Sequence, residues 1–106
     1  MTTFDRREEA FENLFAHDEE MRFRALAHRA KLIGAWAAGL LGKTGTASAT
    51  YVQSVLDGVV ADGSDTSLLR RLSDDLRGAT PAVSERQIRA KMDRLLADSV
   101  RSVRQA

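Results

Sequence analysis

Apolar residues recur every three or four positions along most of this 106-residue chain, which is the spacing that places them on one face of an α-helix. No stretch alternates between apolar and polar residues with the β-branched enrichment of a strand. The length suits one domain with a modest core and leaves no room for a second lobe or a deep substrate cleft. We therefore expect an all-α fold, a small four-helix bundle.

The helix boundaries follow from glycines, caps and the single proline. Helices are expected over residues 4–41, 47–61 and 66–77, and from 84 to near the C-terminus. Gly42 ends the first helix, because glycine readily adopts the left-handed conformation of a helix terminus. Asp65 is expected to cap the third helix, and Ser84 forms a capping box with Gln87 at the start of the fourth.

The first helix is too long for the others to cover. Thirty-eight residues at 1.5 Å per residue would reach about 57 Å. Its front carries Phe4, Phe11 and Phe15 within roughly 40° of one another, with Leu14 beside them, on an otherwise charged rod. This stripe either caps the bundle or binds another protein. We expect a labile amphipathic arm over residues 1–18 and a bundle over residues 19–106, since an isolated helix of this length is marginal in water.

Composition excludes several classes of protein. The net charge is +1, but residues 1–25 carry seven acidic residues against four arginines, whereas residues 26–106 carry twelve basic residues against eight acidic ones. There is no cysteine, so disulfides and cysteine-based zinc sites are excluded. No signal-peptide pattern opens the chain, and its longest weakly charged apolar run, residues 32–41, is too short to span a bilayer. We expect a cytoplasmic protein that does not insert into the membrane.

Chemistry-bearing motifs are weak. Residues 37–44, AAGLLGKT, fit the looser phosphate-loop pattern, but a helix leads into them instead of a buried strand. We interpret them as a helix terminus, with Lys43 a weak candidate for nucleotide contact. His17 and His28 lack a third metal ligand. Acidic residues interrupt the basic last helix, which favours a solvated face over nucleic-acid binding. No catalytic constellation is evident, so we expect no enzyme.

The first 45 residues also resemble a known family. The segments FDRREEAF (4–11), FAHDEE (15–20) and KLIGAWAAGLLG (31–42) are similar to the signature of the alphaproteobacterial ATP synthase inhibitor known as subunit zeta. The remainder of the chain matches more loosely, mainly in helix spacing. Departures at Ala30 and Ile33 fall on the second half of the first helix, outside the arm.

The resemblance implies a protein inhibitor whose N-terminal helix wedges into a catalytic interface of the rotary ATP synthase head and blocks ATP hydrolysis. The protein would then be peripheral to the inner membrane through the synthase. No cofactor is required, although weak ATP or ADP binding is a further implication. The expected partner-binding residues are Phe4, Phe11, Leu14 and Phe15 in an apolar groove, with Arg6, Arg7, Glu8 and Glu12 forming ion pairs at its rim. The alternative is a cytosolic helical module that binds a small ligand such as an adenine nucleotide.

Overall fold

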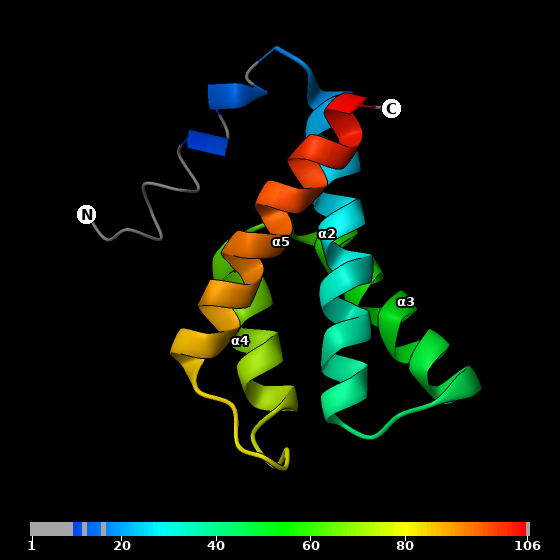
Figure 1. The fold of residues 1–106 in the computed structure, drawn as a ribbon. Coiled ribbons are helices and arrows are strands. Elements are labelled where there is room, and N and C mark those ends of the chain that lie inside the picture. Colours follow the sequence, from blue (N-terminus) through cyan, green and yellow to red (C-terminus); the bar gives the residue numbers. More distant parts are fainter. Residues whose placement is uncertain (1–9, 12, 16, 106) are drawn as a thin grey trace.

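The computed structural model describes residues 10, 11, 13–15 and 17–105, and these residues form helices and no strand. The helices between residues 17 and 105 are α2 (Glu19–Leu40), α3 (Gly45–Ala61), α4 (Asp65–Asp75) and α5 (Glu85–Gln105). Figure 1 shows α2 between α3 and α5, with α4 beside α5 and the end of α5 next to the start of α2. The expected all-α, four-helix class is confirmed.

The first helix is interrupted where the sequence predicts continuity. Residues 10, 11, 13 and 14 are helical, but Phe15 and His17 adopt turn conformations and α2 begins only at Glu19. The Asp18 carboxylate accepts a hydrogen bond of 3.0 Å from the backbone N–H of Met21, which is an N-cap interaction. A cap marks a helix start, so the prediction of one unbroken helix over residues 4–41 is wrong.

The C-terminal end of α2 lies where Gly42 predicts it. Gly42 has a φ of +73°, and its N–H donates to the carbonyl of Gly39 at 3.1 Å. The N–H of Lys43 donates to the carbonyl of Ala38 at 2.9 Å. These two bonds form the Schellman motif, which satisfies carbonyls that the end of a helix leaves unpaired.

The caps of α4 and α5 are polar side chains. Ser84 and Gln87 form the predicted capping box: the Gln87 side chain accepts from the Ser84 N–H at 2.8 Å, and the Ser84 hydroxyl accepts from the Gln87 N–H at 3.1 Å. The predicted cap at Asp65 is wrong. Ser64 caps α4 instead, its hydroxyl accepting from the Ser67 N–H, while Asp65 is buried.

The main core gathers apolar residues from all four helices. We use this name for the buried residues Ala30, Ile33, Ala37, Val55, Leu68, Leu69, Leu72, Leu76, Ile88, Met92 and Leu95. Val55 is the only residue of α3 that is buried, so α3 forms an edge. It approaches α2 closely, because a Cβ added at Gly34 would lie 3.2 Å from the Cα of Val52.

A charged pair is enclosed beside this core. The Arg29 guanidinium donates to the Asp65 carboxylate at 2.5 Å, and both side chains are almost fully buried. The Nε and Nη1 atoms of Arg29 have no hydrogen-bond partner among the described residues. The pair ties α2 to the start of α4, and each charge depends on the other for compensation. No described helix is both long enough and apolar enough to cross a membrane.

Candidate partner-binding surface

Three of the predicted partner-binding residues fall in the described part of the chain: Phe11, Leu14 and Phe15. The other five, Phe4, Arg6, Arg7, Glu8 and Glu12, lie outside the described residues. Their assignment stays a prediction. The geometry of the surface therefore comes from the second half of the arm, residues 10–18.

The Phe11 and Phe15 rings pack edge to face, with their centroids 5.5 Å apart and their planes at 77°. Each is only 7% exposed. They belong to a second cluster with Ala25 of α2 and Leu96 and Val103 of α5, against which Met21, Leu26 and Val100 also pack. We call this set the aromatic cluster.

The burial of these two rings shows where they lie in the free protein. Phe11 and Phe15 are almost fully enclosed within their own chain. In this form of the molecule the two rings cap the bundle. Among the described residues of the stripe, Leu14 is exposed, at 48%.

The described part of the arm leaves a pocket against the bundle. This pocket encloses about 380 Å³ where Leu14 and Phe11 face Leu96 and Val100 of α5, so residues 10, 11 and 13–15 do not fill the surface beneath them. Burying two phenylalanine side chains stabilises by roughly 3–6 kcal/mol, whereas ordering the backbone costs about 1–2 kcal/mol per residue. The two contributions oppose each other, so the free energy that docks residues 10–15 is smaller than the burial of the rings alone would give.

The arm meets α2 through a short non-helical connection. The Asp18 N–H donates to the Phe15 carbonyl at 3.1 Å, and the Asp18 side chain caps α2. His17, between them, is exposed. Because α2 has its own N-cap, it can retain its start when the preceding residues change conformation.

Lys43, the weak candidate for nucleotide contact, is exposed just beyond α2. Its ammonium lies 5.8 Å from the centroid of the Tyr51 ring, which fits a cation–π contact. The preceding residues are helical up to Leu40, so the backbone does not form the strand-to-loop entry of a phosphate-binding loop. The described arm residues Phe11 and Phe15 pack near the start of α2, whereas this lysine follows the end of α2.

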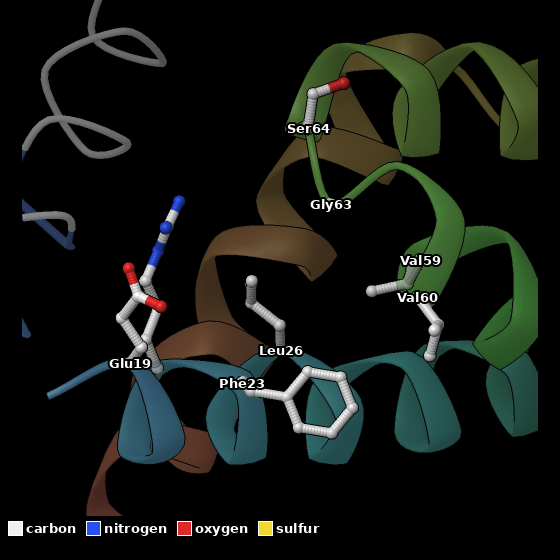
Figure 2. A pocket seen from close by; sticks show the side chains of 8 residues that line it. Glu19, Phe23, Leu26, Val59, Val60, Gly63 and Ser64 are labelled. Atoms are coloured by element: carbon white, nitrogen blue, oxygen red, sulfur yellow. The ribbon is translucent and has the colours of Figure 1, made fainter.

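A second surface depression lies between the start of α2 and the end of α3. It encloses about 430 Å³ and has an apolar floor of Phe23, Leu26, Val59 and Val60. Figure 2 shows Leu26 rising from α2 and Val59 projecting toward it from α3, with Phe23 along the surface of α2. Lys43 is at the opposite end of α2, more than about 20 Å along the helix axis. The one predicted ligand contact is therefore not part of this groove.

A comparison with protein families shows to which family the chain belongs. The family described as ATPase inhibitor subunit zeta matches residues 1–102, nearly the whole chain. The chain belongs to this family. A comparison with curated proteins finds no match. Zeta-family membership identifies the protein as an inhibitor subunit of the ATP synthase, and it is consistent with the expectation that the chain is not an enzyme.

The zeta-family chain holds a polar network that the sequence analysis missed. The Tyr51 hydroxyl donates to the Asp75 carboxylate at 2.7 Å, and Arg71 pairs with the same carboxylate at 3.2 Å while donating to the Ser54 carbonyl at 2.9 Å. Burial, with the hydrogen bond to Asp75, raises the pKa of the Tyr51 hydroxyl. The phenol stays protonated and links α3 to α4, which is a structural role.

The two histidines of this zeta-family chain differ in their surroundings. His17 is exposed, whereas His28 is half-buried, with its Nδ1 3.0 Å from the Ser99 hydroxyl oxygen of α5. Among residues that the structure describes, no group of three or more His, Cys, Asp or Glu side chains is placed to hold a metal ion. Trp36 is partly buried against the main core, and Lys91 lies 5.8 Å from its ring centroid.

The buried Arg29 and the N-cap Asp18 were not predicted, although the sequence contains a signal for each. Arg29 falls in register between Leu26 and Ile33 on the apolar face of α2, so its charge had to be buried with a partner. Asp18 followed by two glutamates is a helix-start pattern, since acidic residues in the first turn favour the helix dipole. Nothing in the sequence indicated that Asp65 is the partner of Arg29.

Proposed function

We propose that this zeta-family protein blocks ATP hydrolysis by inserting its N-terminal arm, residues 1–18, as an amphipathic helix into a catalytic interface of the synthase head. The protein would act in the cytoplasm and lie peripheral to the inner membrane through the synthase. The bundle formed by residues 19–106 would remain outside the interface and carry the arm. The arm would act sterically, because a helix wedged between moving subunits stops rotation without any chemical step.

The observation that carries the proposal is that the amphipathic arm and α2 are not one continuous helix. A non-helical connection that includes residues 15, 17 and 18 precedes α2. Two rings fix the described part of the arm to the bundle, and Leu14 projects from it with about half of its surface exposed. A segment of this kind can leave the bundle while the main core stays packed.

The energetics allow useful affinity. Relative to a released arm exposed to water, burying Phe4, Phe11, Leu14 and Phe15 in an apolar groove would yield roughly 6–12 kcal/mol before ordering costs of several kcal/mol. Helix-in-groove recognition reads apolar anchors at this spacing. Arg6, Arg7, Glu8 and Glu12 would form ion pairs at the rim, which favour orientation and encounter more than affinity.

Leu14→Asp tests the proposal with little risk to the fold, because Leu14 is exposed in the free protein. The variant should lose most of its inhibition of ATP hydrolysis by the purified synthase, since a carboxylate would be buried in the groove. Leu32→Asp is the matched control, an exposed leucine of α2 outside the arm. Full inhibition by a folded Leu14→Asp protein would refute the wedge.

The alternative, a helical module that binds an adenine nucleotide or another small ligand, has no described site that supports it. Lys43 is solvent-exposed and does not line the surface depression between the start of α2 and the end of α3. We therefore keep nucleotide binding as an implication of the family resemblance and propose no site for it.

A further inference from the structure

We infer that the aromatic cluster is an autoinhibitory latch: while Phe11 and Phe15 are docked between α2 and α5, the arm is withheld from the synthase. The inference rests on the proposed function, because it concerns the control of the same arm. It follows from a conflict between two uses of the same side chains. A ring that is 93% enclosed by its own bundle cannot at the same time fill a groove on another protein.

The latch surface and the arm consist of different residues. The rings belong to residues 10–15, whereas the surface that holds them consists of Ala25 on α2 and Leu96 and Val103 on α5. Substitutions in this surface therefore weaken the docked state and leave the sequence of the arm intact. This separation makes the latch testable apart from the wedge.

The docked state should lower the apparent affinity for the synthase. When only a fraction of the molecules has a released arm, the apparent dissociation constant equals the intrinsic one divided by that fraction. Destabilising the docked state raises the fraction and strengthens inhibition. If the latch exists, removing buried apolar surface from the inhibitor should strengthen its inhibition of ATP hydrolysis.

Two neighbouring leucines of α5 provide a matched pair of variants. Leu96 is 8% exposed and belongs to the aromatic cluster, whereas Leu95 is 9% exposed and belongs to the main core. Both are shortened equally by substitution with alanine, but only Leu96 lines the surface under the arm. Comparing the two alanine variants distinguishes the effect of releasing the arm from the effect of a general loss of stability.

The experiment measures ATP hydrolysis by the purified synthase against the concentration of each full-length inhibitor. We expect Leu96→Ala to inhibit at about a tenfold lower concentration than the unsubstituted protein, and Leu95→Ala to leave the half-inhibitory concentration within about twofold. Val103→Ala, a smaller change in the same surface, provides a second test if Leu96→Ala does not fold. Far-UV circular dichroism confirms the fold of each variant.

The outcomes distinguish the latch from the wedge. Unchanged or weaker inhibition by folded Leu96→Ala and Val103→Ala, while Leu14→Asp abolishes inhibition, would overturn the latch and leave the wedge standing. Equal strengthening by Leu95→Ala and Leu96→Ala would also overturn the latch, because the effect would then follow general instability. Full inhibition by Leu14→Asp would refute the wedge, and the latch with it.

Discussion

The molecule has two buried apolar clusters that differ in the parts of the chain that they hold together. The main core draws on all four helices from α2 to α5, whereas the aromatic cluster combines one side of α2 and α5 with two rings from outside the four helices. Leu95 and Leu96, adjacent in sequence and buried to the same extent, belong to different clusters. Equal burial therefore does not mean equal importance for the global fold.

The difference lies in what must unfold to open each cluster. Opening the main core separates helices and disrupts the whole domain. Opening the aromatic cluster requires only residues 10–15 to leave a surface that they fill incompletely. Local openings of this kind have smaller free energies than global unfolding, and segments that act in binding are drawn from them.

The largest effect should come from breaking the buried pair beside the main core. Asp65→Ala leaves the Arg29 guanidinium buried without a compensating charge, so we expect it to lower the free energy of unfolding by about 3–5 kcal/mol. Urea denaturation followed by circular dichroism measures the loss. Arg29→Met combined with Asp65→Leu should recover most of it, because the double variant buries no unpaired charge. A loss below about 1 kcal/mol for Asp65→Ala would contradict this account of the pair.

A smaller effect is expected where α3 approaches α2. Gly34→Val places a side chain 3.2 Å from the Val52 backbone, and we expect a loss of about 1–3 kcal/mol as the helices separate. Gly39→Val is the matched control on the same helix, because nothing lies within 4 Å of a Cβ at that position. Thermal unfolding of both variants tests the contact. Equal stabilities would show that the interface adapts without cost.

The aromatic cluster should behave differently from a core when its rings are removed. Phe→Ala in a core typically costs about 3–5 kcal/mol, but here the loss is limited to the free energy that docks the arm. We expect Phe11→Ala and Phe15→Ala each to cost less than about 3 kcal/mol, and the double variant to cost little more than either. A double-mutant cycle from urea denaturation measures this coupling. Additive losses of core size would show that the arm is part of the global fold.

The smallest effect concerns pH at the start of α4. Hydrogen bonds from the Ser67 hydroxyl and the Ser64 N–H hold the pKa of Asp62 below its usual value. A lowered pKa means that the carboxylate stabilises the folded state above the unfolded value of about 3.9, and that this contribution disappears as the pH falls through the folded value.

Asp62→Asn removes this contribution. The difference in free energy of unfolding between the unsubstituted protein and the variant should therefore shrink as the pH is lowered from 6 to below 4. Urea denaturation at several pH values follows it. A difference that stays constant over this range would exclude the carboxylate as its source.

Much of this fold could be predicted from local sequence signals. Gly42 and the Ser84–Gln87 box act within a few residues of their own positions, and both predictions are confirmed. The buried face of α5, which includes Ile88, Met92 and Leu96, also follows the helical spacing of its apolar residues. The interruption before α2 was missed because the apolar stripe continues in helical register through residues that in fact form a turn.

The candidate site was harder to predict. An amphipathic stripe shows that Phe11 and Phe15 require an apolar surface, but it does not say whether this surface is on the same chain or on another one. That choice depends on where α2 and α5 place Ala25, Leu96 and Val103, which are far apart in the sequence. The same limit applies to the partner of Arg29, which is 36 residues away.

The central claim is that the arm leaves the aromatic cluster when the protein inhibits. Methyl groups of Val103 pack in the cluster that contains the Phe11 and Phe15 rings, whereas those of Ile33 and Val55 lie in the main core. Methyl NMR spectra of selectively labelled protein, free and bound to the purified synthase head, follow both sites in one experiment. We predict that binding removes the ring-current shift of the Val103 methyls and leaves the Ile33 and Val55 methyls unchanged. An inhibited complex in which the Val103 methyls keep their ring-current shift would contradict the account.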